Sequence, residues 1–361
     1  MKLTAEGCRA RRLRLLEAVE ADLIVINNTR HIQYLSGLYI SPLGLSGWGP
    51  NFLLLESTGR TTLLAQNFLG GEAAGAYVDD LVVWRWYDAA ANPGLPLYRE
   101  GLQQLNSHLA RLKPTRLGVE SGWLPGQLKS YEPVDITDAL VDLRRVKDSD
   151  ELALMRATIR AIEAGHAAGR RVIRPGLSEM DVFNAVCGAI QLEAGAPALS
   201  LGDYVSGERT RESSGPPTAR ILEPGDLMIL DIYPVINGYR ADFTATLTVD
   251  GSMPPRFQAL EAALHAALQA GENLLRAGSR AGDVYDAVKA SMDGHGFGQG
   301  FTHHAGHGLG LGHPEAPYLV PNSDEVLAAG DVVTLEPGSY GDEFGARIEH
   351  NYLILEDGFE R

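Results

Sequence analysis

The sequence predicts an α+β protein of two domains, a smaller α/β domain over residues 1–142 and a larger domain over residues 143–361. Three observations predict this fold class. Strands and helices alternate along the first third of the chain, as in a small α/β domain. The charged segment Asp142–Glu151 then marks a boundary. Beyond it, Arg174–Val182 and Arg276–Val284 share Arg, Gly, Asp and Val at the same offsets, which predicts two similar αα–ββ halves around one centre.

Composition restricts the kind of partner and the location. With 361 residues, 45% hydrophobic and 21% charged, the chain is long enough for two domains with full cores. A formal net charge of −15 argues against nucleic acid and anionic membranes as main partners, because both attract basic surfaces. Two cysteines, Cys8 and Cys187, are too few for a disulfide framework. Without an apolar stretch of membrane-spanning length or a signal-peptide core, the protein is expected to be cytoplasmic.

The first domain is expected to combine short strands with amphipathic helices. Leu13, Leu16 and Val19 recur at helical spacing over residues 9–20, and a second helix ends near Lys113. Apolar runs between turn-forming residues predict strands at Leu23–Ile26, Asn51–Glu56, Thr61–Ala65, Leu81–Trp86, Arg116–Glu120 and Pro133–Ile136. The Gly- and Pro-rich loop 41–50 carries Trp48, which either packs on its own domain or serves as an interface anchor.

Each half of the second domain is expected to open with a pair of helices. Asp148 and Glu151 have capping-box spacing, and the helix that they begin has an apolar face at Leu152, Met155, Ile159 and Ile162. Gly176 and Gly278 stand where a glycine ends the first helix of each pair. His166 on the first helix is expected to pack or to face solvent rather than to bind a ligand.

A hairpin over residues 227–249 places two carboxylates in apolar surroundings. Leu227–Ile232 is a nearly unbroken apolar run, Asn237-Gly238 suits a hairpin turn, and apolar residues alternate with polar ones after it. Asp231 and Asp242 then share one face, directly opposite or diagonal according to where the turn is centred. A single Asp at a strand end is usually a turn or capping residue. Two buried carboxylates at cross-strand distance repel, and a cation between them removes that cost.

Further candidate ligands lie downstream. Imidazoles gather among small residues in Phe301–Pro317, and Glu336 and Glu349 each follow an apolar run. The candidate set is two Asp, two Glu and one His. Four carboxylates balance two divalent cations, and an oxygen-rich set with one imidazole suits Mn²⁺, Co²⁺ or Zn²⁺. Two such ions about 3.5–4 Å apart can activate water and polarise a carbonyl, which indicates hydrolysis.

Several short motifs resemble those of the pita-bread metallopeptidases, the family of creatinase, prolidase, aminopeptidase P and methionine aminopeptidase. They are Gly306–Gly308 (GHG), Glu336–Tyr340 (EPGSY) and Gly345–Glu349 (GARIE), within a resemblance that extends from about Leu143 to Glu356. Tyr34–Gly37 (YLSG) resembles the N-terminal domain of the prolidase and aminopeptidase P branch. The resemblance implies a pita-bread catalytic domain preceded by a creatinase-like α/β domain.

The resemblance also implies roles for individual residues. Its five metal ligands fall on Asp231, Asp242, His307, Glu336 and Glu349. Asp242 and Glu349 would bridge two ions, Asp231 would bind one of them, and His307 and Glu336 the other. Manganese is the expected ion, with zinc or cobalt as alternatives. Glu336 would also relay a proton to the leaving nitrogen, and Arg347 would orient the carboxylates.

The chain departs from the family pattern near the expected substrate. Ser214 and Pro314 stand where the family has histidines that steady the substrate, and His303 or His313 is a hypothetical replacement. Tyr233 follows the first ligand in place of a usual glycine, and Ala245 replaces a usual arginine.

The implied activity is hydrolysis of the bond before proline. Arg209 and Arg211, in place of Asn and Ala, would receive the carboxylate of an Xaa-Pro dipeptide, with Tyr340 and Trp48 as further substrate contacts. Alternatively, both arginines are solvated or paired with Glu208 and Glu212. An aminopeptidase P acting on longer peptides, a metal-free member of the fold and a non-catalytic scaffold are the other candidates. The resemblance also implies a homodimer in which the loop with Trp48 reaches the partner's pocket.

Overall fold

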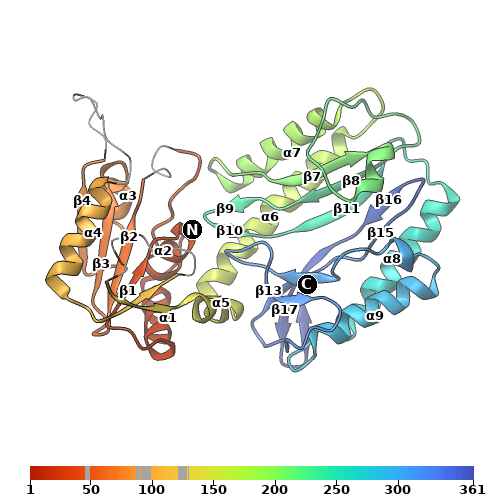
Figure 1. Cartoon of the computed structure of the whole chain (residues 1–361). Coiled ribbons are helices and arrows are strands. Elements are labelled where there is room, and N and C mark those ends of the chain that lie inside the picture. Colours follow the sequence, from red (N-terminus) through yellow and green to blue (C-terminus); the bar gives the residue numbers. More distant parts are fainter. Residues whose placement is uncertain (45–48, 87–89, 91–98, 121–127, 129) are drawn as a thin grey trace. The chain divides into compact units, whose positions relative to one another are not determined.

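The computed structural model describes residues 1–44, 49–86, 90, 99–120, 128 and 130–361. The chain divides into two compact units, Met1–Arg144 and Arg145–Arg361. Figure 1 labels the elements of each unit. The boundary expected between residues 142 and 143 falls within helix α5 (Thr137–Arg145).

The first unit is built on a mixed six-stranded sheet of order β4-β3-β2-β1-β5-β6. Strand β1 pairs antiparallel with β2 and parallel with β5. All six expected strands are present, at β1 (Leu23–Ile26), β2 (Phe52–Glu56), β3 (Thr61–Gln66), β4 (Asp80–Trp84), β5 (Arg116–Val119) and β6 (Glu132–Asp135). The helical segments are α1 (Ala5–Ala18), α2 (Thr29–Ser36), η2 (Asn67–Leu69), α3 (Gly70–Ala73), α4 (Arg99–Leu112) and α5.

Two features of the first unit differ from expectation. Helix α1 buries Cys8, Arg11 and Leu15. Of the expected apolar face, Val19 just after the helix is buried, Leu16 is half-buried and Leu13 is exposed. Arg11 can be buried because its Nε donates to the Tyr34 carbonyl at 2.9 Å. Helix α2 was not expected. It begins at the cap residue Asn28, whose side chain accepts from the Arg30 N–H.

The second unit consists of two halves, each with a helix pair packed on strands (Figure 1). The first half contains α6 (Ser149–Val172), α7 (Glu179–Ala194), β7 (Gly202–Ser206), η4 (Gly207–Glu212), β8 (Leu227–Ile232), β9 (Val235–Ile236), β10 (Tyr239–Arg240) and β11 (Phe243–Thr248). The second contains α8 (Pro255–Glu272), α9 (Ala281–Gly294), η5 (Gly298–Gly300), β12 (Gly306–Gly308), β13 (Glu315–Leu319), β14 (Val332–Leu335), β15 (Gly338–Tyr340), β16 (Gly345–Arg347), β17 (His350–Leu355) and β18 (Gly358–Glu360). None of the helices in the described ranges is long and apolar enough to cross a membrane.

The two halves have separate cores and corresponding turns. Val186 of α7 packs with Leu230 of β8 in one core, and Val288 of α9 packs with Leu335 of β14 in the other. The main sheets have the orders β11-β8-β7 and β13-β12-β14-β17-β18. Gly176 and Gly278 follow the first helix of each pair with φ of +90° and +85°, values that favour glycine. The repeated sequence pattern therefore does mark two similar halves.

Helix α6 begins as expected but packs on a different face. The Asp148 N–H donates to Glu151 Oε2 at 2.9 Å, which forms the capping box. Met155 and Ile162 are buried, whereas Leu152 and Ile159 are only half-buried. The buried face is centred on small residues and includes Thr158, Ala161 and Gly165, because α7 packs closely there. His166 is packed, as expected, with Nε2 3.0 Å from the Phe243 carbonyl.

The hairpin register settles how the two aspartates face each other. Asn237 and Gly238 both have positive φ, 50° and 84°, so the turn is centred on them. Asp231 of β8 then pairs with Thr244 of β11, which makes Asp242 its diagonal neighbour on the same face.

Candidate metal centre

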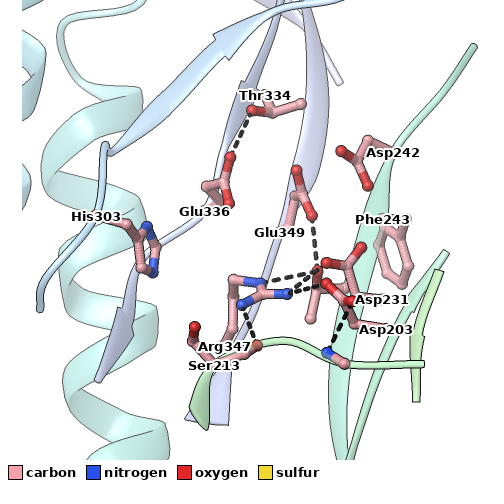
Figure 2. Close-up of polar contacts among 12 residues, drawn as sticks. Asp203, Ser213, Asp231, Asp242, Phe243, His303, Thr334, Glu336, Arg347 and Glu349 are labelled. Carbon is pink, nitrogen blue, oxygen red and sulfur yellow. Dashed lines mark hydrogen bonds and ion pairs between the residues drawn. The ribbon is translucent and has the colours of Figure 1, made fainter. Parts of the chain in front are cut away.

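Five side chains from both halves of the second unit converge on one site. Ligand atoms of Asp231, Asp242 and Glu349 lie within 4.8 Å of one another, and so do those of His307, Glu336 and Glu349. These five residues lie on, or next to, strands β8, β11, β12, β14 and β17. The structure therefore brings together every residue that the sequence suggested as a metal ligand, and Figure 2 shows the four carboxylates.

The site has the chemistry of a cation-binding centre. All five side chains are buried, with exposed fractions between 1% for Glu349 and 8% for Glu336. Asp231 Oδ1, Asp242 Oδ1 and Glu349 Oε1 are buried without a hydrogen-bond partner. A buried carboxylate oxygen without a partner is costly unless a cation compensates it. The donor set, mostly oxygen with an imidazole, fits a pair of divalent ions.

The electrostatics of the site agree with this assignment. Burial, reinforced by the neighbouring carboxylates, raises the pKa of Asp242 and of Glu349 well above their ordinary values. Burial also opposes ionisation of Glu336. The hydrogen bond from His304 and the proximity of His307 outweigh that effect and lower the Glu336 pKa. The raised pKa values of Asp242 and Glu349 show that these carboxyls repel one another when no cation lies between them.

His307 is held with one nitrogen facing the carboxylates. Its Nδ1 donates to the Gly308 carbonyl at 2.9 Å, and its Nε2 lies 3.5 Å from Glu336 Oε1 and 3.8 Å from Asp242 Oδ2. Burial lowers the His307 pKa and so favours the neutral ring that binds metals. The backbone hydrogen bond of Nδ1 leaves Nε2 as the ligand atom.

Glycines beside His307 allow the strands to approach closely. A Cβ on Gly306 would lie 2.1 Å from the Thr334 carbonyl oxygen, a backbone atom that cannot move away cheaply. We expect Gly306→Ala to destabilise the fold by about 1–3 kcal/mol, the usual cost of overpacking, and to weaken metal binding. Urea unfolding and metal titration measure both effects. Gly188→Ala in α7 is the matched control, because a Cβ there meets nothing within 4 Å; equal effects of the two substitutions would contradict the expectation.

Three polar residues that orient the ligands were not identified from the sequence. Thr244 donates to Glu349 Oε2 at 2.7 Å, and Thr334 donates to Glu336 Oε1 at 3.1 Å. Asn351 accepts from the Asp242 N–H and donates to its carbonyl. Thr244 lies two positions from Asp242, Thr334 two from Glu336, and Asn351 two from Glu349. Residues two apart share a strand face, so the alternation could have revealed them.

Arg347 on β16 joins several parts of the site. Its Nη2 donates to Asp231, and its Nη1 donates to the Ser213 carbonyl at 3.0 Å (Figure 2). Nη1 also donates to the Tyr340 hydroxyl at 2.6 Å. The Tyr340 hydroxyl is also 3.2 Å from His303 Nε2. Burial raises the Tyr340 pKa to about 12, so its hydroxyl stays protonated. These contacts place Arg347, Tyr340 and His303 along one side of the carboxylates.

Three further titratable groups border the ligands. Asp203 of β7 pairs across the sheet with Asp231, and burial together with the Asp231 charge raises its pKa to about 6. His304 Nε2 is 3.0 Å from Glu336 Oε1, and His313 Nε2 is 2.6 Å from Asp242 Oδ2. Asp203 stands within an ordinary strand pattern, and no feature of the sequence distinguished it.

The expected substrate contacts are less closely gathered. Arg209 pairs with the buried carboxylate of Glu179, not with Glu208 or Glu212, so its charge holds the loop after β7. Arg211 is partly exposed, and it donates to the Asp342 carbonyl at 2.9 Å and lies 3.5 Å from Glu208. Trp48 lies outside the described residues.

Two protein families match this chain, one over each of its two units. Residues 153–356 match the model of metallopeptidase family M24, and residues 9–146 match the creatinase/prolidase N-terminal domain. The "Probable dipeptidase PepE" of Mycobacterium tuberculosis is 33% identical over 63% of this chain, and the chain spans only 60% of that relative's length. The "Xaa-Pro dipeptidase" of Pyrococcus furiosus is 28% identical over 67% of this chain and 69% of its own.

Solved structures show the same fold. The prolidase of Pyrococcus horikoshii superposes with a TM-score of 0.83 at 21% identity, over 98% of this chain and 97% of its own. The expected architecture, a pita-bread domain behind a creatinase-like domain, is therefore confirmed. Peptidases of family M24 use a centre of two divalent ions, for which the clustered side chains are candidate ligands. The family match covers more than half of the chain, and the chain belongs to metallopeptidase family M24.

Proposed function

We propose that the chain is a metallopeptidase that hydrolyses the peptide bond before proline, most effectively in Xaa-Pro dipeptides. The observation that carries the proposal is the convergence of Asp231, Asp242, His307, Glu336 and Glu349 in one buried cluster. The dipeptidases among its relatives support the choice of substrate. An Xaa-Pro aminopeptidase acting on longer peptides is the alternative within the same family.

The proposed ligand roles are those that the family resemblance implies. Asp242 and Glu349 would contribute to both ions, Asp231 to one of them, and His307 and Glu336 to the other. We propose Mn²⁺ as the native ion because carboxylates dominate the set, with Zn²⁺ or Co²⁺ as alternatives. When bound, two divalent ions lower the pKa of water and polarise a peptide carbonyl.

The chain's own residues move the proton and orient the groups. Glu336, kept ionised by His304 and His307, takes the proton of the attacking water and passes it to the leaving nitrogen. Arg347 fixes Asp231 and, through the Tyr340 hydroxyl, the ring of His303. His303 is the proposed replacement for a family histidine that steadies the substrate, and the Tyr340 hydroxyl fixes its ring.

Arg209 and Arg211 are the residues that would distinguish a dipeptide substrate from a longer peptide. Arg211 retains part of its guanidinium exposed and is the better candidate for the dipeptide carboxylate, because Arg209 is neutralised by Glu179. We expect faster hydrolysis of Ala-Pro than of Ala-Pro-Ala, measured as kcat/KM with Mn²⁺ present. Arg211→Ala should reduce the dipeptide rate more than the tripeptide rate. Faster cleavage of the tripeptide by the unaltered protein would instead support the aminopeptidase.

We also propose a cytoplasmic homodimer with neither nucleic acid nor membrane as a partner. The net charge of −15 supports the absence of nucleic acid and membrane partners, and the presence of only two cysteines supports a reducing compartment. Trp48 is proposed to reach the partner's pocket, and Trp48→Ala should then change the preferred residue before proline while dimerisation, followed by light scattering, persists. Unchanged selectivity would contradict that role.

A further inference from the structure

We infer that His313 is a sixth protein ligand of the metal centre, so that two imidazoles, His307 and His313, hold one of its ions. This inference rests on the proposed metal-dependent function, because it concerns the composition of the same centre.

The geometry places His313 at the ligands. Its Nε2 is 2.6 Å from Asp242 Oδ2, and ligand atoms of Asp242, His307 and His313 lie within 4.8 Å of one another. The rings of His307 and His313 are 5.0 Å apart and inclined at 62°. Two imidazoles and a carboxylate oxygen at this spacing can surround one ion at ordinary metal–ligand distances of about 2.0–2.2 Å.

A departure from the family pattern at Tyr233 supports the position of His313. Tyr233 lies two positions after Asp231, where the family usually has glycine, and its ring packs against His313 with centroids 4.7 Å apart. A glycine would leave that face of the imidazole without a neighbour. The two unusual residues, 80 positions apart in the numbering, are therefore in direct contact beside the ligands. This contact orders the ring before any ion arrives and so reduces the entropy lost on binding.

His313 is buried beside the ligands, because its side chain is only 16% exposed. A neutral imidazole has one nitrogen with a free lone pair. Nε2 cannot both donate a proton to Asp242 and bind an ion, so a hydrogen bond that persists in the loaded protein is the competing arrangement.

The test counts imidazoles in the Co²⁺-loaded protein. Co²⁺ shifts the ring protons of a bound histidine far outside the normal proton NMR range. We expect shifted resonances from two rings, one set lost in His313→Gln and the other in His307→Gln. His295→Gln, on the exposed end of α9, should lose neither. Resonances from a single ring, or from two rings that both persist in His313→Gln, would overturn the inference. Failure of the unaltered protein to bind Co²⁺ would contradict the proposed function instead.

Metal preference gives a second measurement. Imidazole favours Zn²⁺ more than Mn²⁺, so His313→Gln should weaken Zn²⁺ binding by about 100-fold and Mn²⁺ binding by less than about tenfold. Tyr233→Gly should shift the two affinities in the same direction, whereas Tyr233→Phe, which keeps the packed ring, should leave them unchanged. Equal weakening for both ions in His313→Gln would show that the residue only positions Asp242. Competition titrations with a chromophoric chelator measure these affinities even if one variant is less stable.

Discussion

Glu336→Gln should reduce hydrolysis of Ala-Pro by about 10²- to 10⁴-fold, the usual contribution of a general acid–base group. The Glu336 carboxylate is buried, accepts from Thr334 and lies beside His304 and His307, which keep it ionised. An amide in its place has nearly the same shape and can still accept from Thr334. It cannot take a proton from water or deliver one to the leaving nitrogen. The effect should therefore appear mainly in kcat, measured under metal saturation.

Glu336 is also a proposed ligand, so metal content must be measured on the same samples. If Glu336→Gln retains two ions per chain and still loses activity, the loss reflects proton transfer. Glu343→Gln is a suitable control, because Glu343 is a glutamate only seven positions away that is exposed and paired with Arg256 at 2.8 Å. The control should keep full activity. A metal-loaded Glu336→Gln variant within tenfold of the unaltered rate would contradict the proposed role.

The carboxylate ligands were predictable because each lies where a local pattern is informative, whereas only the family resemblance selected His307 among the neighbouring histidines. Asp231 interrupts an apolar strand, and Asn237-Gly238 fixes the turn that brings Asp242 to the same face. The sequence left two registers open, since both place the aspartates on one face. Only the backbone of Asn237 and Gly238, with positive φ at both, selects the diagonal arrangement.

Features that depend on distant partners were not predictable. Arg209 looked available for a substrate, but Glu179, 30 positions earlier, neutralises it inside the protein. Arg11 lies in the charged first helix of the chain, yet it is buried against the carbonyl of Tyr34. In both cases a long-range hydrogen bond compensates the cost of burying charge. Period and local propensity carry no information about such partners.

Metal removal should abolish hydrolysis and lower stability together. Asp231, Asp242 and Glu349 each have a buried oxygen without a hydrogen-bond partner, and a cation compensates them only in the folded chain. At a free-ion concentration about 1,000 times Kd, one bound ion stabilises the folded state by about 4 kcal/mol. For a domain of this size that corresponds to a fall in Tm of about 10 °C on chelation. Calorimetry with and without a chelator measures the change, and an unchanged Tm would contradict the proposed centre.

The stability lost on metal removal should also depend on pH in a defined direction. In the metal-free protein the pKa values of Asp242 and Glu349 are raised by burial and mutual repulsion. Groups with raised folded-state pKa contribute stability that is fully present below their unfolded pKa values of about 4 and is lost as pH rises through the raised values. The Tm difference between loaded and metal-free protein should therefore widen from pH 5 to pH 8.

A substitution separates this repulsion from other effects of pH. Asp242→Asn removes one of the repelling charges, so the metal-free variant should be more stable than the metal-free unaltered protein at pH 8, although its metal affinity is lower. At about pH 2.5, below the unfolded Asp pKa of about 4, Asp242 is protonated in both states of the unaltered chain and the two proteins should differ little. If the metal-free Asp242→Asn variant is instead less stable than the metal-free unaltered protein at pH 8, the expectation is contradicted. The hydrogen bond between the Asp242 carboxylate and His313 would then stabilise the fold by more than the repulsion destabilises it.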